Sequence, residues 1–183
     1  MWGTLKMEPA RHRPDLLAPS VVAALAVWPG DPDEVLVAEI DPELADTAAF
    51  CQAYQVGLDM SANCVVVAGK RAGELRHAAC LVLATTRADV NGVVRRHLDA
   101  RKASFAAMDD AVARTGMAYG GITPIGLPPG WPVLVDARVV ATPYVIIGSG
   151  VRHSKIGLPG PALARLPGAA VLDGLAVETA AAT

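Results

Sequence analysis

The sequence contains few of the residues that identify the commonest functional classes. Aromatic residues make up 4% of the 183 residues, so a core must be built mainly from Val, Leu, Ile and Ala. The three cysteines, Cys51, Cys64 and Cys80, are odd in number and include no Cys-x-x-Cys pair. This pattern argues against a zinc site and predicts reduced thiols in a cytoplasmic protein.

The sequence also has no large excess of positive or negative charge, and it has no long apolar run. Sixteen Lys and Arg residues against 18 Asp and Glu residues give a net charge of −2. This balance excludes the broad basic surface typical of proteins that bind extended duplexes, although a partner could still touch a short segment. The apolar run at residues 16–28 is too short to span a bilayer as a helix, so we expect no membrane partner.

Familiar catalytic arrangements are missing from the sequence as well. There is no Gly-x-Ser-x-Gly elbow, and none of the four histidines has metal-ligand spacing with another. We therefore predict a chain that uses no metal and no cofactor. The composition that is present, 52% hydrophobic and 19% charged residues, predicts one compact domain with a sizeable core.

The apolar patterns predict a single α/β (α+β) domain over residues 15–176, after a flexible tail at residues 1–14. Because most connections have hairpin length, we expect a mixed, mostly antiparallel, curved sheet flanked by helices. Predicted helices cover residues 15–27, 47–54, 89–98, 104–115 and 162–166, and predicted strands cover residues 35–40, 63–67, 77–85, 131–136, 144–149 and 170–173. Residues 180–183 are expected to form a second tail.

Local signals define several of these boundaries. Asp46, Asp89 and Ser104 are predicted helix N-caps, and Gly116 is the expected end of the helix that Ser104 begins, with Phe105, Met108 and Val112 facing inward. The apolar pattern of residues 64–85 predicts a long β-hairpin with an exposed turn at residues 70–76. Its return strand is apolar on both faces, which is typical of a central, covered strand.

Residues 117–127 concentrate glycine and proline between a helical pattern and an apolar strand. Gly120 and Gly121 can adopt φ > 0 and expose backbone N–H groups, and Pro124 restricts the chain after them. Such a loop can hold a phosphate, a carboxylate or the oxyanion of an attacked ester. An ordinary tight turn explains the same residues. A side chain at position 121 is expected to block a ligand with less effect on folding.

The features around this loop resemble those of the YbaK/ProX family, aminoacyl-tRNA deacylases related to the editing insertion of bacterial prolyl-tRNA synthetase. That family has a capped helix ending in Gly, a Gly-x-x-x-Pro loop and a strand carrying Asp. The matching residues here are Ser104, Gly116, Gly120-Gly-Ile-Thr-Pro124, Gly126 and Asp136. Ala62-Asn-Cys-Val-Val-Val67 is similar to the family's Ala-Lys-Thr-Leu-Val-Val strand, and Tyr144-Val-Ile-Ile-Gly-Ser-Gly150 to its strand that ends in a small-residue turn. The resemblance covers residues 41–175, most of the chain.

The resemblance implies a trans-editing hydrolase that removes a wrong amino acid from the 3′ end of a charged tRNA by means of an oriented water. It implies that the loop holds the aminoacyl carbonyl, with catalytic positions at Gly120, Gly121, Pro124, Asn63 and Asp136. Substrate-binding positions are expected at Thr47, Lys102, Ile122, Thr123, Gly126, Ser149 and Gly150. The aminoacyl-tRNA 3′ end is the implied partner, with a tRNA synthetase as a further one.

The sequence departs from the family pattern at Asn63, where the family has a functional lysine. Asparagine can donate a hydrogen bond but cannot neutralise a phosphate. Three interpretations follow: Asn63 acts more weakly, another cation such as Lys102 substitutes, or the domain no longer hydrolyses. Asn63 could also be only a turn residue before a strand. The alternative function is then a catalytically inactive module that binds tRNA 3′ ends or a small acylated ligand.

Two further candidates have ordinary structural explanations. Asp136 ends a predicted strand and is expected near the glycine loop, yet a surface aspartate closing a strand would look the same. Arginines and a lysine at residues 95–102 would meet phosphates near a site, or they simply form a solvated helix face.

Overall fold

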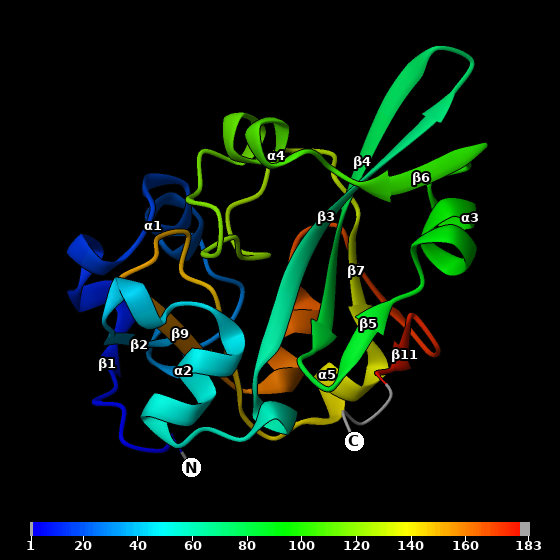
Figure 1. Cartoon of the computed structure of the whole chain (residues 1–183). Helices are drawn as coiled ribbons and strands as arrows, with labels where there is room; N and C mark the ends of the chain where they lie inside the picture. The colour runs from blue at the N-terminus through cyan, green and yellow to red at the C-terminus, as the bar shows by residue number, and fades with distance from the viewer. Residues whose placement is uncertain (1, 180–183) are drawn as a thin grey trace.

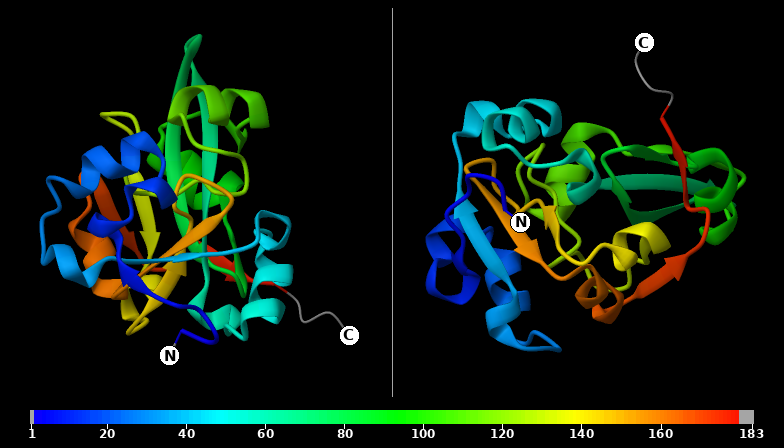
Figure 2. Two further views of the ribbon diagram at one scale, coloured as in Figure 1. Left: turned by 90° about the vertical axis from the view of Figure 1, so that its left-hand side faces the viewer. Right: turned by 90° about the horizontal axis from the view of Figure 1, so that it is seen from below.

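The computed structural model of the chain describes residues 2–179 and is organised around one long β-hairpin (Figure 1). Strands β3 (Ala62–Arg71) and β4 (Glu74–Leu83) pair antiparallel along their whole lengths. Only Ala72 and Gly73 separate them, with φ of 49° and 85°, as a two-residue hairpin turn requires. The turn expected over residues 70–76 is therefore shorter, and the hairpin end projects beyond the rest of the molecule in Figure 1 and in the left view of Figure 2.

The hairpin is the middle of a five-stranded sheet in the order β10-β7-β4-β3-β6. Strand β7 (Val133–Asp136) runs parallel to β4, and β10 (Ala169–Leu172) runs parallel to β7. On the other side, β6 (Lys102–Phe105) pairs antiparallel with β3. Strand β4 is central and almost fully buried along its second half, which confirms the prediction from its two apolar faces.

A second sheet, in the order β1-β2-β9-β8, is antiparallel throughout. Its strands are β1 (Glu8–Pro9), β2 (Leu36–Glu39), β9 (Ser154–Leu158) and β8 (Val145–Ile147). Two short strands, β5 (Thr86–Ala88) and β11 (Ala176–Glu178), form a separate antiparallel pair. The mixed, mostly antiparallel α/β domain expected from the sequence is confirmed.

Helices are short and lie around the sheets. The α-helices are α1 (Pro19–Leu25), α2 (Thr47–Tyr54), α3 (Arg95–His97), α4 (Met108–Thr115) and α5 (Ala137–Ala141). Single 3₁₀ turns cover Ala10–His12, Pro14–Leu16, Pro32–Glu34, Pro42–Leu44, Leu58–Met60 and Gly160–Arg165, and a π-helical turn covers Val90–Val94. The helix expected over residues 15–27 thus divides into a 3₁₀ turn and α1, with Pro19 in the first turn of α1 where proline is tolerated.

The core is aliphatic, as the shortage of aromatic residues requires. One cluster joins the two sheets, with Leu81 and Val135 packed among Ile147 and Ile156. The opposite face of the first sheet packs its own cluster, which includes Cys80 and the helical residues after Asp89. Phe50 of α2 is fully buried and centres a third cluster beside β8.

The N-terminal segment differs from the flexible tail that we expected. Strand β1 pairs with β2, and Ala10 has no exposed surface. The Thr4 N–H donates to the Tyr54 carbonyl at 2.9 Å, and the Trp2 ring meets Tyr144 edge-on at 5.4 Å between centroids. Backbone pairing therefore holds residues 8–10 beside β2, while Thr4 and Trp2 are held by Tyr54 of α2 and by Tyr144. The tail expected at residues 180–183 lies outside the described residues.

The structure confirms some of the predicted helix ends and shows that one predicted N-cap is wrong. The Asp89 carboxylate accepts the N–H groups of Gly92 and Val93, and Gly116 ends α4 with φ of 68°. Ser104 is not a cap, because it lies in β6 opposite Ala68, and α4 begins four residues later at Met108. Pairing with β3 overrides the local helical signal.

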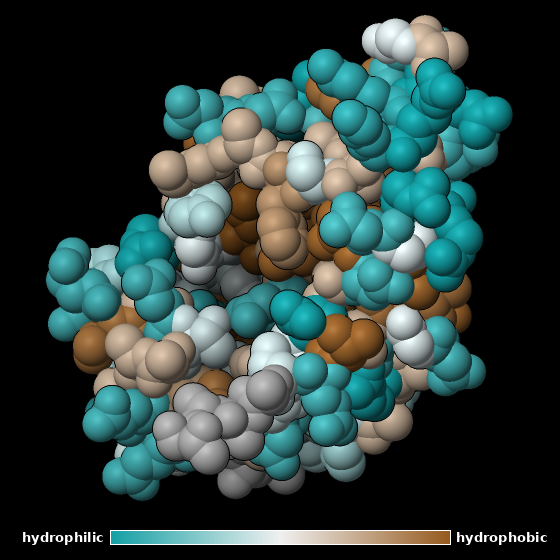
Figure 3. Space-filling view, turned by 45° about the vertical axis from the view of Figure 1, so that its right-hand side comes forward, coloured by the Kyte–Doolittle hydropathy of each residue, from teal (hydrophilic) through white to brown (hydrophobic). Residues whose placement is uncertain are grey.

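The inward orientation expected for Phe105 and Met108 is consequently wrong as well. Their exposed fractions are 59% and 52%, because one residue ends an edge strand and the other starts a surface helix. Figure 3 shows hydrophobic side chains gathered around a hollow in the middle of one face, below the mostly hydrophilic hairpin end.

Leu81 provides a test of the shared core. It is fully buried in β4 between the two sheets, so Leu81→Ala should lower the free energy of unfolding by about 2–5 kcal/mol in urea denaturation. Leu75→Ala, in the same strand but 43% exposed, is the matched control and should cost about 0.5 kcal/mol or less. Equal losses would show that the two sheets do not share a core at β4.

Candidate functional site

The two sheets meet at a parallel bridge between Ser61 and Ile146, and a cavity of about 330 Å³ opens beside it. The start of β3, the residues before and at the start of α2, the glycine loop, β8 and β9 all contribute to its wall. The wall consists of Ala45, Asp46, Thr47, Ser61, Ala62, Asn63, Cys64, Val65, Val66, Phe105, Ala106, Ala111, Tyr119, Gly120, Ile122, Ile146, Ile147, Gly148 and Lys155. Segments that are distant in the sequence therefore build a single site.

Asn63 and Thr47 form a polar pair in this wall. Thr47 is the first residue of α2, and its hydroxyl donates to the Asn63 Oδ1 at 2.8 Å. This bond orients the amide so that its NH₂ group has no acceptor within residues 2–179. Asn63, at the start of β3, thus shares one cavity with Gly120, as the sequence predicted. Thr47, expected as a substrate-binding residue, lies there too.

The glycine loop contributes to the cavity wall two residues whose amides are unpaired within residues 2–179. Gly120, with φ of 83°, and Ile122 line the wall, and their N–H groups donate to no acceptor in the described part of the chain. Gly121 behaves differently: its N–H donates to the Ala118 carbonyl at 2.9 Å, and its own carbonyl accepts from Gly150 at 2.7 Å. The two adjacent glycines therefore do not both expose amides, contrary to the expectation.

The loop rests on the chain between β8 and β9 through contacts that leave no room for side chains. A Cβ on Gly121 would lie 2.4 Å from the Val151 carbonyl oxygen, and a Cβ on Gly148 would lie 2.5 Å from the Gly121 carbonyl oxygen. Ser149 is fully buried, and its hydroxyl accepts from the Ser154 hydroxyl at 2.7 Å. Ser149 and Gly150, expected to bind substrate, instead support the loop from behind the cavity.

The second half of the loop faces another hollow. Pro124 and Gly126 line a mostly apolar depression of about 520 Å³ together with Trp28 and Trp131. Thr123, the residue before Pro124, is fully buried, and its hydroxyl has no partner in the part of the chain that the structure describes. The expected site residues Pro124, Thr123 and Gly126 thus lie outside the cavity wall: Pro124 and Gly126 border the other hollow, and Thr123 is buried inside the loop.

Asp136 is placed away from the cavity wall, contrary to the prediction that it approaches the glycine loop. Its buried carboxylate accepts the Arg138 N–H and guanidinium at 3.0 and 2.9 Å and the Ala176 N–H at 2.9 Å. Burial raises the pKa of Asp136, but these hydrogen bonds outweigh it and leave the pKa below its ordinary value. The ionised carboxylate joins β7, α5 and β11 as a structural element.

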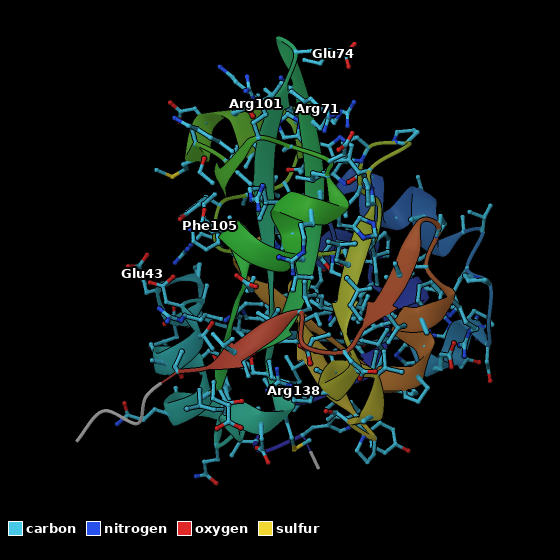
Figure 4. The ribbon with its side chains drawn as sticks, turned by 90° about the vertical axis from the view of Figure 1, so that its right-hand side faces the viewer. Glu43, Arg71, Glu74, Arg101, Phe105 and Arg138 are labelled. Atoms are coloured by element: carbon cyan, nitrogen blue, oxygen red, sulfur yellow. The ribbon has the colours of Figure 1, made fainter. Side chains whose placement is uncertain are left out.

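Lys102 is also separate from the cavity. It lies in β6 directly opposite Lys70 and lines a different, open hollow near the hairpin end. Figure 4 shows Arg71 and Arg101 at this projecting end, with Phe105 further along β6 towards the body of the domain. Lys102, which one of the three interpretations of Asn63 offered as a substitute cation, therefore does not line this cavity.

The cavity contains a lysine that the sequence did not indicate. Lys155 in β9 is only 9% exposed, its ammonium donates to the Ala45 carbonyl at 2.9 Å, and it lies 5.2 Å above the Phe50 ring centroid. Burial, followed by the nearby charge of Arg152, lowers the pKa of Lys155, while Cys51 and Asp46 act in the opposite direction. Its only sequence signal is a single charged residue in the short strand β9.

The other groups around the cavity are weakly polar or exposed. Arg152 lies beside Gly120, donates to the carbonyls of Tyr119 and Pro42, and stays one-third exposed. Asp46, its carboxylate partner at 3.5 Å, is 77% exposed. Burial raises the pKa of the Cys64 thiol, which keeps it protonated and unsuited to act as a nucleophile. Among residues 2–179, no three His, Cys, Asp or Glu side chains converge to hold a metal ion.

A family comparison decides the classification of this fold and cavity. The family model of the aminoacyl-tRNA editing domain matches residues 41–166. The chain belongs to this family. The matched segment of the editing domain includes β3, the glycine loop and Lys155, so it contains the whole cavity wall.

Solved structures agree with the fold of an editing domain. A candidate trans-editing enzyme for prolyl tRNA synthetase has a TM-score of 0.71 and 23% identity, over 86% of this chain and 97% of that one. A protein from a study of computational epitope grafting gives the same score and identity, over 85% and 95%. The hypothetical protein APE2540 has a TM-score of 0.67 and 19% identity, over 77% and 90%. No curated protein matches the sequence significantly. No helix within residues 2–179 is long and apolar enough to cross a membrane.

The loop contacts of the editing domain predict that Gly121 is structural. Because a new Cβ would collide with the Val151 backbone, Gly121→Ala should lower the free energy of unfolding by about 1–3 kcal/mol in urea denaturation. In Gly57→Ala, the control, the Cβ meets only the movable Asp59 carboxylate, and stability should change less. If both variants are as stable as the wild type, the loop is not seated on Val151.

Proposed function

We propose that the chain is a trans-editing hydrolase, an enzyme of the cytoplasm that deacylates mischarged aminoacyl-tRNA at its 3′ end without a metal or cofactor. Membership of the aminoacyl-tRNA editing domain family supports this function. The observation that carries the proposal is that one cavity wall contains three residues whose donors have no partner within the described residues: Gly120 and Ile122 through their N–H groups, and Asn63 through its NH₂ group. These donors suit an uncharged oxygen that gains negative charge during reaction.

The reaction needs orientation rather than a protein nucleophile, because an aminoacyl ester is already activated. A water oxygen forms a bond to the acyl carbon, the bond from that carbon to the ribose oxygen breaks, and the proton lost by water ends on the ribose oxygen. The carbonyl oxygen carries negative charge in between. Under this proposal the Gly120 and Ile122 N–H groups bind that oxygen, and losing one such donor typically costs about 10²–10³ in rate.

Asn63 has a positioning role in this scheme. Its Oδ1 is occupied by Thr47, so its NH₂ group is available to a ribose hydroxyl or a phosphate oxygen of the terminal nucleotide. A neutral hydrogen bond of this kind contributes about 0.5–1.5 kcal/mol net. Asn63 therefore supplies alignment, not charge neutralisation.

The cavity also supports a role as a second sieve. Its volume is about 330 Å³, and Val66, Ile122 and Ile147 make part of its wall apolar, so it favours acyl groups with small, uncharged side chains. A synthetase separates substrates that differ by one methylene by only about 1–3 kcal/mol, so a separate hydrolytic step is needed to reach high fidelity. The synthetase that produces the mischarged tRNA is then a further partner.

A second candidate function is non-catalytic binding of tRNA 3′ ends or a small acylated ligand. It is favoured by Asn63, which stands where the resembled family has a functional lysine. The cavity wall also holds no carboxylate besides that of the exposed Asp46 among the described residues, so a strong general base is missing there.

Release of amino acid from a panel of charged tRNAs separates the two functions. We expect the wild-type protein to hydrolyse at least one mischarged tRNA with a small amino acid well above the spontaneous rate, and to leave the correctly charged tRNA intact. Radiolabelled amino acid retained on the tRNA is the measurement. Saturable tRNA binding with no release from any substrate would instead support the binding module.

Substitutions of Asn63 test its position in the site. Asn63→Ala should slow deacylation at most about tenfold, the size of one neutral hydrogen bond. Asn63→Lys should tighten tRNA binding and raise deacylation, because a charge-assisted contact is roughly twice as strong. Binding curves and single-turnover rates measure both effects.

The control for these variants is Lys102→Ala, which removes a cation outside the cavity and should leave the rate of deacylation unchanged. If Lys102→Ala abolishes tRNA binding while Asn63→Lys has no effect, the nucleic acid is held at β6 and Asn63 does not contact it.

A further inference from the structure

The ammonium of Lys155 is buried in the cavity without a carboxylate partner. It donates to the Ala45 carbonyl, which uses one of its three N–H groups, and it makes no salt bridge within the described residues. The Phe50 ring, 5.2 Å away, offers a further weak attraction. Two donors of a positive group are therefore left for something that enters the cavity.

This arrangement is costly for the fold. A buried charge loses its hydration, and one carbonyl with one ring replaces only part of it. An apolar side chain of similar length would pack against Phe50 and Ile146 without that cost. The charge of Lys155 is thus better explained by a ligand than by stability.

We infer that Lys155 binds the oxyanion that forms on the acyl carbon during deacylation, together with the Gly120 and Ile122 amides in the same cavity; this inference rests on the proposed function. The ammonium stays protonated throughout, so it stabilises charge and transfers no proton. At a group as buried as Lys155, such an interaction is stronger than in solution.

The place of Lys155 in the cavity favours this oxygen over other groups of the substrate. The α-ammonium of the amino acid has the same charge and would be repelled. A phosphate stays hydrated at an open surface more easily, and the one-third exposed Arg152 beside Gly120 is better placed for it. The acyl carbonyl remains as the group that gains negative charge deep in the cavity.

The charge of Lys155 gives the reaction a distinctive pH dependence. Besides Arg152, the titratable groups near it are Cys51 of α2, with Asp46, Cys64 and Tyr119 in the cavity wall. Burial and Arg152 lower the pKa of Lys155 below its ordinary value. Because the protonated form is the active one, the enhancement over spontaneous hydrolysis should fall as pH rises through that lowered pKa. An exposed lysine would lose its charge only at higher pH.

Three variants test the inference by steady-state deacylation kinetics and thermal denaturation. Lys155→Met should lower kcat by about 10²–10³ with little change in KM, while its melting temperature stays equal to or above that of the wild type. Lys155→Arg keeps a cation that does not titrate, so it should retain more activity than Lys155→Met and lose the alkaline decline. Lys6→Met removes an exposed lysine and should match the wild type in every measurement.

Each other outcome contradicts the inference. Wild-type kcat in Lys155→Met, or a clearly lower melting temperature, would make Lys155 a structural residue while the proposed function stands. An alkaline decline that persists in Lys155→Arg would assign that decline to another group and overturn the inference in the same way. If the wild type releases no amino acid from the whole tRNA panel, the proposed function fails and takes the inference with it.

Discussion

The antiparallel pairing of β3 with β4 is the constraint on which the rest of the structure depends. It places β4 in the middle of the first sheet, between β3 and the parallel strand β7, and it fixes where β3 begins. Because β3 begins at Ala62, the adjacent Ser61 can bridge to Ile146 of the second sheet. The cavity exists at this junction. A slip of the hairpin by one residue would turn Asn63 to the other face and separate it from Thr47.

The sequence predicted the elements whose formation depends on residues close together in the chain. The helix at residues 47–54, the Asp89 cap and the Gly116 terminus depend on neighbours within a few residues, and the hairpin joins two strands that follow each other in the sequence. Ser104 failed as a cap because pairing with Ala68, far away in the sequence, outcompetes a helical signal. The N-terminal segment failed for a similar reason: its order comes from β2, which its own composition does not reveal.

The position of a site residue could be predicted from the sequence where a single segment determines it. It could not be predicted where several segments pack together to form the site. That Asn63 and Gly120 share one cavity was predicted because the segments that contain them both resemble motifs of the same family. The free amide at Ile122, the engaged amide at Gly121 and the buried Lys155 depend on how β8, β9 and the loop pack together. Asp136 was predicted near the loop and lies elsewhere, because a carboxylate at a strand end can accept hydrogen bonds from nearby N–H groups as readily as it can bind a substrate.

The glycine loop has two faces, and this links the cavity to the fluorescence of two tryptophans. Gly120 and Ile122 border the cavity, whereas Pro124 and Gly126, only a few residues further, border the hollow that holds the indoles of Trp28 and Trp131. Neither indole lines the cavity itself. Indole emission depends on the surroundings of the ring, so a ligand that shifts the loop changes the intrinsic fluorescence of the chain without touching a chromophore. Intrinsic fluorescence is thus a label-free way to ask whether a ligand in the cavity shifts the loop.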